Sequence, residues 1–463
     1  MMEDPVRKTI GIALCCLFAG LGIGWGGTQT VLDQPRESSF APTSVAEPFE
    51  ATMEKDIARK PMVMKEHMDY LNARFDLSRR VDPRATMSRG KPLPVGPTAR
   101  LPEGMTFDKL AKLTPEEIKS RGIFPYKPLA FIEHSVGGMT FPKHVIRELP
   151  RLERFDLDYD LPEQFLPEFP PPMYLTTHKE AGDVSQGKLV TIDNYYELFN
   201  GLLNPKQLEG LRLLVTQFPQ QQFNATDDRK TVKPSLGVTC FDCHANGHTN
   251  RATHLVGDIR PQAHRNRINT PSLRGVNQQR LFGSQRALKT IEDFTEFEQR
   301  AAYFDGDPCI ATKKGVNVLE RASQVHFMAE FEALLDFPPA PKLDIYGKLD
   351  PKKATDDEMA GQKIFFGKGK CLECHSGPAY TDNMMHDLQV ERFYASEMVH
   401  KQYIRPEGAI KTFPLRGVKD SPPYMHDGRC LTLEDTVEFF NLIQQLRLTA
   451  KEKKQLVAFL RQL

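Results

Sequence analysis

Two copies of one short cysteine motif constrain this chain more than any other feature of its sequence. The pattern C-x-x-C-H occurs at residues 240–244 and again at residues 371–375. Two thiols at this spacing can form thioether bonds to the two vinyl groups of one haem, and the histidine that follows can ligate the iron. We therefore expect two covalently bound c-type haems. The residues expected to hold them are Cys240, Cys243 and His244 for the first haem and Cys371, Cys374 and His375 for the second, with His244 and His375 as the iron ligands.

A pair of zinc knuckles is the alternative interpretation of these motifs. Cysteine pairs that share a zinc ion usually lie about 15–20 residues apart. Here residues 244–370 separate the two pairs. A thioredoxin-like redox pair would leave the repeated histidine unexplained, so the pattern favours haem.

The sequence around the motifs is also repeated. Residues 270–298 align with residues 412–440 at a constant spacing of 142 residues, and both copies contain the sequence L-R-G-V. Such self-similarity is typical of a duplicated structural unit. We expect two cytochrome c-like domains in tandem.

Helix signals in the second half predict a mainly helical fold. Thr355 and Glu358 have the spacing of a capping box, which predicts a helix that continues to Phe366 and ends at Gly367. Similar signals predict further helix starts at Thr114, Asn204, Thr432 and Thr449.

The expected fold is mainly α, with two tandem cytochrome c-like haem domains after a proline-rich, largely irregular N-terminal arm. Residues 92–172 hold 14 of the 35 prolines, which excludes a regular helix bundle there. The predicted boundaries are 1–29 for a signal peptide or membrane anchor, 30–91 for a linker, 92–224 for the arm of unknown role, 225–345 for the first (peroxidatic) domain and 346–463 for the second (electron-transfer) domain.

The N-terminus suggests export. Residues 10–27 carry no charge and follow Arg7 and Lys8, as in a signal peptide or an N-terminal anchor; a buried core helix is the alternative. Either of the first two places the haem motifs in the periplasm, tethered to the inner membrane if the segment is uncleaved. The formal net charge of +1 excludes the broad basic surface of a general nucleic-acid binder.

Several short sequences in the second half carry a family resemblance. They are F-F-G at 365–367, the second haem motif, G-P-A-Y-T-D-N at 377–383, P-L-R-G-V at 414–418, P-Y-M-H-D-G at 423–428 and L-E at 433–434. With them, residues 225–463 resemble the bacterial di-haem cytochrome c peroxidase family, including its MauG-like branch.

The resemblance implies a periplasmic enzyme that reduces hydrogen peroxide. Electrons would pass from a small periplasmic donor of the cytochrome c or cupredoxin type to the C-terminal haem, and from there to the N-terminal, peroxidatic haem. Two alternatives stay open. One is a MauG-like oxidase that acts on a protein or organic substrate, and the other is a non-enzymatic di-haem electron carrier.

The distal ligand of the first haem is not fixed by the sequence. His254 and His264 are candidates, whereas His248 lies too close to His244 to reach the opposite face. The arginines near these histidines could bind the haem propionates, which are anionic. These are Arg251, Arg260, Arg265 and Arg267.

The second distal ligand and the acid–base group for peroxide also stay open. The family commonly uses a methionine or tyrosine in the helix after the H-D-G loop, but residues 436–441 contain neither. Met425 is the favoured alternative. The others are Met385, His386 and His426, and the acid–base candidates are Glu296, Glu298 and Glu320.

Two cysteines lie outside the motifs and the apolar run. In an oxidising compartment Cys309 and Cys430 are expected either to pair or to stay as buried thiols. The sequence does not choose between these outcomes.

Overall fold

The computed structural model describes residues 49–130, 139–152, 161–220, 235–254, 267–304, 318–399, 402–403 and 408–463. Within these residues no helix has the length and apolar character needed to cross a membrane. The apolar run at residues 10–27 lies outside the described residues.

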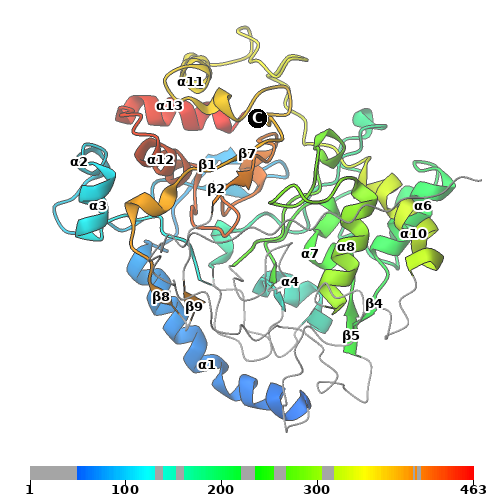
Figure 1. Cartoon of the computed structure of the whole chain (residues 1–463). Coiled ribbons are helices and arrows are strands. Elements are labelled where there is room, and N and C mark those ends of the chain that lie inside the picture. Colours follow the sequence, from blue (N-terminus) through cyan, green and yellow to red (C-terminus); the bar gives the residue numbers. More distant parts are fainter. Residues whose placement is uncertain are drawn as a thin grey trace, which may run out of the picture. The chain divides into compact units, whose positions relative to one another are not determined.

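Helices provide most of the regular structure, as the sequence predicted (Figure 1). Their bounds are α1 (Phe49–Arg74), α2 (Phe107–Leu110), α3 (Pro115–Arg121), α4 (Lys143–Glu148), α5 (Tyr195–Phe199), α6 (Pro205–Leu214), α7 (Cys240–Cys243), α8 (Ile291–Phe304), α10 (Val318–Glu332), α11 (Asp356–Phe366), α12 (Leu433–Ile443) and α13 (Ala450–Leu460).

The strands are short and form antiparallel pairs within the described residues. The pairs are β1 (Val81–Thr86) with β2 (Pro92–Pro94), β3 (Met139–Thr140) with β6 (Thr253–His254), β4 (Phe218–Gln220) with β5 (Ser235–Val238), β7 (Met385–His386) with β10 (Ile410–Lys411) and β8 (Met398–Val399) with β9 (Gln402–Tyr403). They fix loops in place and form no layer of their own.

The predicted capping signals start helices where expected. Thr355 caps α11, and its hydroxyl and the Glu358 carboxylate each accept a hydrogen bond from the other residue's backbone N–H. Gly367 ends the helix, as predicted. The same reciprocal bonds begin α3 at Thr114, α6 at Asn204 and α13 at Thr449, while Thr432 caps α12. Each cap satisfies backbone N–H groups that have no partner inside the helix.

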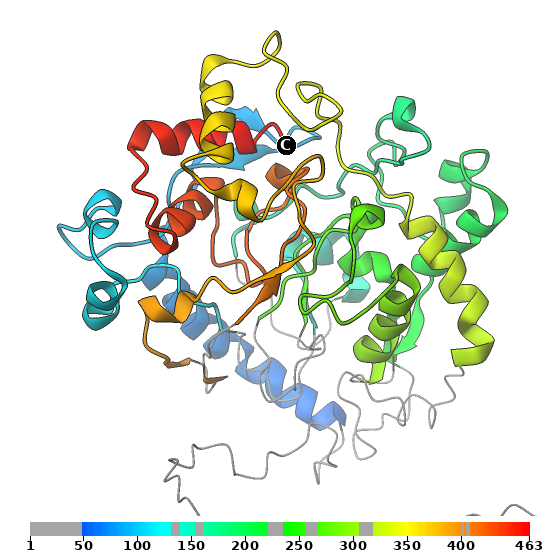
Figure 2. The same cartoon turned by 45° about the horizontal axis from the view of Figure 1, so that its top comes forward.

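Helix α6 lies against α10, and helix α11 lies against α13 (Figures 1 and 2). Helix α6 packs on α10 at Gly210, where an added Cβ would lie 1.9 Å from the Phe327 carbonyl oxygen. Helix α11 packs on α13 at Gly361, where an added Cβ would lie 1.9 Å from the Gln455 carbonyl oxygen. Only glycine permits such close backbone approach. We call residues 205–332 the first repeat and residues 356–460 the second repeat.

The loops between these helices are also alike. In the first repeat, Phe282 and Leu288 form an isolated antiparallel bridge, and α8 follows. In the second repeat, Tyr424 and Cys430 form the equivalent bridge, and α12 follows. The repeated sequence thus has a repeated local structure.

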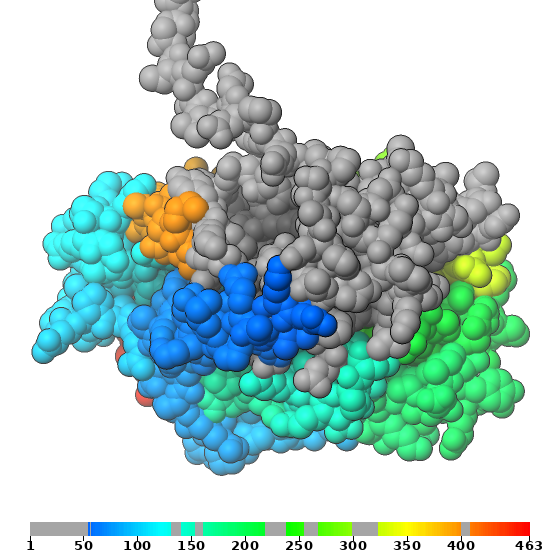
Figure 3. All heavy atoms as spheres, turned by 90° about the horizontal axis from the view of Figure 1, so that it is seen from below, coloured from blue at the N-terminus to red at the C-terminus, as the bar shows by residue number. Residues whose placement is uncertain are grey.

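The N-terminal segment (residues 49–199) differs from the prediction. Residues 49–91 were expected to be a linker, but they contain α1 and β1. Leu71 and Phe75 are fully buried, in an apolar cluster with Leu431 of the second repeat. The body of α1 lies at the surface in Figure 3, with Met62 exposed. The sequence alone did not indicate this helix, because its burial depends on contacts with later residues such as Leu431.

The described part of residues 92–199 packs on both repeats. The Thr98 hydroxyl and the Tyr126 hydroxyl both donate to the buried carboxylate of Asp435 in α12, at 2.7 and 3.0 Å. Arg151 forms an ion pair with Asp242 in α7. This part of the chain therefore contributes to the cores around both cysteine motifs.

Candidate haem sites

The first cysteine motif is held in a short, capped helix. The Thr239 hydroxyl accepts from the Asp242 backbone N–H at the start of α7, and the Thr239 backbone N–H donates to the Asp242 carboxylate. Arg151 donates to the same buried carboxylate at 2.7 Å. These contacts fix the turn that carries Cys240 and Cys243.

His244 follows this turn directly. Its Nδ1 lies 2.9 Å from the carbonyl oxygen of Pro271, which can only accept a hydrogen bond. The proton must therefore sit on Nδ1, so Nε2 carries the lone pair that a metal ion can accept.

His375 repeats this arrangement after the second motif. Its Nδ1 lies 2.9 Å from the carbonyl oxygen of Tyr380, so Nε2 again carries the lone pair. Burial lowers the pKa of His375, which favours the neutral imidazole that ligates metal ions. Tyr380 is itself buried, and its hydroxyl donates to the Gly347 carbonyl oxygen.

Both sites fit a covalently attached haem. Each has two thiols one turn apart, and the next imidazole is fixed by a backbone carbonyl in the tautomer that iron requires. The described residues contain no group of three or more His, Cys, Asp or Glu side chains placed to share a metal ion.

Helix α8 brings an acidic side chain to the first motif. Phe297 packs in the same apolar cluster as Cys243. Burial, followed by nearby carboxyl groups that include Glu298, raises the pKa of both Cys240 and Cys243. Glu298 therefore lies close enough to both thiols to interact electrostatically with them.

Glu332 at the end of α10 is an acidic residue that the sequence analysis missed. It is buried next to α8, with its carboxyl 2.9 Å from the Thr295 hydroxyl, and burial raises its pKa to about 8. It also contributes to the raised pKa of Cys240. Its place within the apolar run Phe331–Leu335 was the available signal, since a glutamate there must be buried.

The other predicted acids and arginines are placed only in part. Glu296 lies on α8 and is partly buried, whereas the side chain of Glu320 lies outside the described residues. Arg251 donates to the carbonyl oxygens of Pro422 and Ser421. Arg267 is buried, and Arg260 and Arg265 lie outside the described residues.

The three histidines after the first motif have different outcomes. The His248 Nε2 lies 3.0 Å from the Asp420 carbonyl oxygen, and its Nδ1 lies 2.8 Å from the Ser272 hydroxyl. Both nitrogens are thus engaged, in agreement with its exclusion as a ligand. His254 pairs with Met139 through the backbone, but its side chain and all of His264 lie outside the described residues.

The candidates for the second distal ligand lie in two places. Met425 packs against the large apolar cluster of the second repeat, as Cys371 and Phe440 also do. Met385 lies in β7. The Nε2 of its neighbour His386 lies 2.7 Å from the Asp382 carboxylate. The backbone carbonyl of His426 accepts from the Asn269 N–H. Met425 stays the favoured prediction.

Of the two cysteines outside both the motifs and the apolar run, the structure describes one. Cys430 is fully buried as a thiol, and burial raises its pKa. Cys309 lies outside the described residues, so their pairing stays a prediction.

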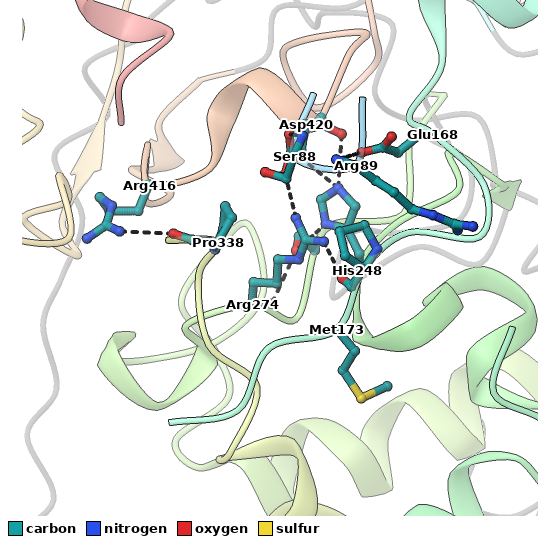
Figure 4. Close-up of polar contacts among 12 residues, drawn as sticks. Ser88, Arg89, Glu168, Met173, His248, Arg274, Pro338, Arg416 and Asp420 are labelled. Atoms are coloured by element: carbon teal, nitrogen blue, oxygen red, sulfur yellow. Dashed lines mark hydrogen bonds and ion pairs between the residues drawn. The ribbon is translucent and has the colours of Figure 1, made fainter. Parts of the chain in front are cut away.

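A buried polar network joins the two repeats to the N-terminal segment (Figure 4). At its centre, Asp420 of the second repeat forms an ion pair with Arg274 of the first repeat at 2.9 Å, with side chains 2% and 4% exposed. The Ser88 backbone N–H and hydroxyl donate to the same carboxylate at 2.9 and 2.6 Å. His248 reaches the Asp420 backbone carbonyl. Burial, followed by Arg274, lowers the pKa of His248, so its imidazole is neutral.

The repeats also exchange equivalent backbone hydrogen bonds. The Asn269 N–H donates to the His426 carbonyl oxygen at 2.9 Å, and the Lys411 N–H donates to the Ser284 carbonyl oxygen at 2.9 Å. Asn269 and Lys411 are equivalent in the sequence repeat, as are Ser284 and His426. The loop of each repeat thus contacts the same strand of the other, as in a two-fold interface.

Three characterised proteins are similar to part of this chain. The cytochrome c551 peroxidase of Nitrosomonas europaea is 32% identical over 143 residues, which cover 29% of this chain and 42% of that protein. The cytochrome-c peroxidase IdrP2 of Denitromonas iodatirespirans is 30% identical over 155 residues, covering 26% and 42%. The methylamine utilization protein MauG of Methylorubrum extorquens is 27% identical over 152 residues, covering 29% and 41%. The chain is related to the di-haem cytochrome c peroxidases and MauG. This confirms the resemblance carried by the motifs of the second half.

The similarity is partial. The chain spans less than half the length of the curated relatives it matches, and no model of a known protein family matches it. Among solved structures, a MauG-like protein associated with microbial copper homeostasis has a TM-score of 0.40 at 19% identity, covering 66% of this chain and 95% of that one. The diheme peroxidase BthA of Burkholderia thailandensis has a TM-score of 0.35 at 15% identity, covering 64% and 94%.

Proposed function

We propose that this protein is a periplasmic di-haem c-type peroxidase. The observation that carries the proposal is the repeated arrangement of the motif histidines. His244 and His375 each follow a C-x-x-C turn, and the Nδ1 of each is hydrogen-bonded to a backbone carbonyl oxygen. Cys240 and Cys243 would attach the first haem, and Cys371 and Cys374 the second. When bound, each haem would supply an iron that exchanges single electrons with its surroundings.

The two repeats would have different tasks. Peroxide reduction consumes two electrons and two protons and yields two water molecules. Carboxyl groups act on both motifs: Glu332 and Glu298 on the first and Asp382 on the second. Asp382 is held by His386 at 2.7 Å, and the second motif shares its apolar cluster with Met425. We therefore place peroxide at the first haem and electron entry at the second, with a small cytochrome c or cupredoxin as donor.

The apolar run at residues 10–27 would direct export and, if uncleaved, tether the protein to the inner membrane. The domain boundaries 225–345 and 346–463 stay as proposed, with one extension. Because α6 packs on α10, the first domain would include α6 at residues 205–214.

Glu298 is the residue we propose to move a proton between the peroxide oxygens. A positioned acid–base group typically contributes about 100-fold to 10,000-fold in rate. Replacing Glu298 with glutamine is therefore expected to lower kcat for peroxide reduction by about 100-fold or more, with unchanged haem content. Steady-state turnover with a reduced cytochrome donor measures this.

The matched control is Glu292→Gln. Glu292 lies on the same helix, but its carboxylate contacts His326 at 3.4 Å and is nearly half exposed. This control is expected to retain wild-type turnover. Wild-type turnover in Glu298→Gln would remove Glu298 from the mechanism.

Similarity to MauG favours one second candidate, an oxidase that uses peroxide equivalents on a protein or organic substrate. The same assay separates the two functions. Rapid peroxide consumption driven by the reduced donor alone identifies the peroxidase, whereas an oxidase consumes peroxide only when its organic substrate is present.

A further inference from the structure

The junction between the repeats contains a buried cation, Lys411, with no acidic side chain paired to it among the residues that the structure describes. Lys411 in β10 is 3% exposed. Its ammonium group donates to the Gln279 side-chain oxygen at 2.9 Å and lies 5.5 Å and 5.4 Å from the ring centres of Phe282 and Phe413. Among the described residues it forms no ion pair. Burial and then Arg286 lower its pKa to about 8.

Arg286 adds a second cation to the same place. It belongs to the first-repeat loop between Phe282 and Leu288, and its Nε is buried without a hydrogen-bond partner among the described residues. Arg286 is half-buried. The two positive charges repel each other, and burying the Lys411 charge without a counter-ion is costly. The described residues around Lys411 and Arg286 therefore supply two positive charges and no anion.

Lys411 is connected to the second haem motif by hydrogen bonds. The backbone carbonyl oxygen of the next residue, Thr412, accepts a hydrogen bond from the Thr381 hydroxyl at 2.7 Å. Thr381 follows Tyr380, whose carbonyl holds His375. Lys411 is thus anchored to the segment that orients the imidazole of the second site.

We propose that Lys411 and Arg286 bind a propionate carboxylate of the haem attached at Cys371 and Cys374. This inference rests on the proposed function, because it requires that haem. Arginine and lysine are the usual partners of a carboxylate, and a partly desolvated pair is stronger than an exposed one. Since Arg286 comes from the first repeat and Lys411 from the second, the propionate would also link the two repeats.

The test is the midpoint potential of each haem in the full-length holoprotein, measured by spectroelectrochemistry. Reduction adds one electron, which a nearby positive charge stabilises. Lys411→Met is therefore expected to shift the potential of the His375 haem to a more negative value. Lys411→Arg keeps the charge and is expected to restore most of that potential. Lys451→Met, at an exposed site on α13, is expected to leave both potentials unchanged.

The failures can be told apart. An unshifted potential in Lys411→Met, or a shift confined to the His244 haem, overturns the propionate site while the proposed function stands if two haems and peroxide turnover are present. The wild-type potential can also be measured with added formate at constant ionic strength. A potential that changes with formate shows that an exchangeable anion binds there, which overturns the propionate site. A chain without haem overturns both proposals.

Discussion

Replacing both Cys240 and Cys243 with alanine is expected to remove the first haem alone and to reduce donor-driven peroxide turnover to background. Each haem is proposed to be attached by its own pair of thiols, so the second haem should stay bound and reducible. Intact mass spectrometry counts the haems, and stopped-flow absorbance follows the response to peroxide.

The reciprocal variant tests the division of tasks. Cys371→Ala combined with Cys374→Ala should also lose donor-driven turnover, yet it should keep the spectral response of the first haem to peroxide. Cys430→Ala is the control, because Cys430 is buried outside both motifs; it should retain two haems. Turnover that persists without the first pair, or a peroxide response that disappears with the second pair, would contradict the assignment.

Replacing Asp420 with asparagine is expected to have the largest effect on stability. The change leaves Arg274 buried without its carboxylate and weakens two hydrogen bonds from Ser88. Breaking a buried ion pair by removing one partner typically costs about 3–5 kcal/mol. Urea denaturation should show this loss in the free energy of unfolding.

Two further variants make the Asp420 result specific. Asp82→Asn removes a solvent-screened pair with Arg84 and should cost much less stability than Asp420→Asn. A double replacement, Arg274→Met with Asp420→Leu, removes both charges and should recover most of the lost stability. A cost for Asp420→Asn no larger than that for Asp82→Asn would show that this network does not hold the repeats together.

Much of the helical architecture was predictable because its signals are local. The capping residues at Thr355 and Thr449 act on backbone groups within four residues, so the sequence shows both partners at once. The same holds for the motif histidines, which follow their cysteines directly. In the structure, α8 and α12 begin at equivalent positions of the sequence repeat, Ile291 and Leu433.

The contacts between distant segments could not be read from the sequence. Arg274 and Asp420 lie 146 residues apart, and nothing around either residue indicates that it is buried. The same applies to Glu332 and Lys411, whose unusual environments are created by packing of other elements. Helix α1 was missed for a related reason, since its order depends on Leu71 and Phe75 meeting a core formed by later residues.

Electron paramagnetic resonance of the oxidised holoprotein, recorded with and without hydrogen peroxide, tests the central claim most directly. An iron with an exchangeable position beside Glu298 should give a high-spin ferric signal, and peroxide should abolish that signal. Two low-spin signals that do not respond to peroxide, in either the oxidised or the half-reduced protein, would contradict a peroxidase and identify an electron carrier.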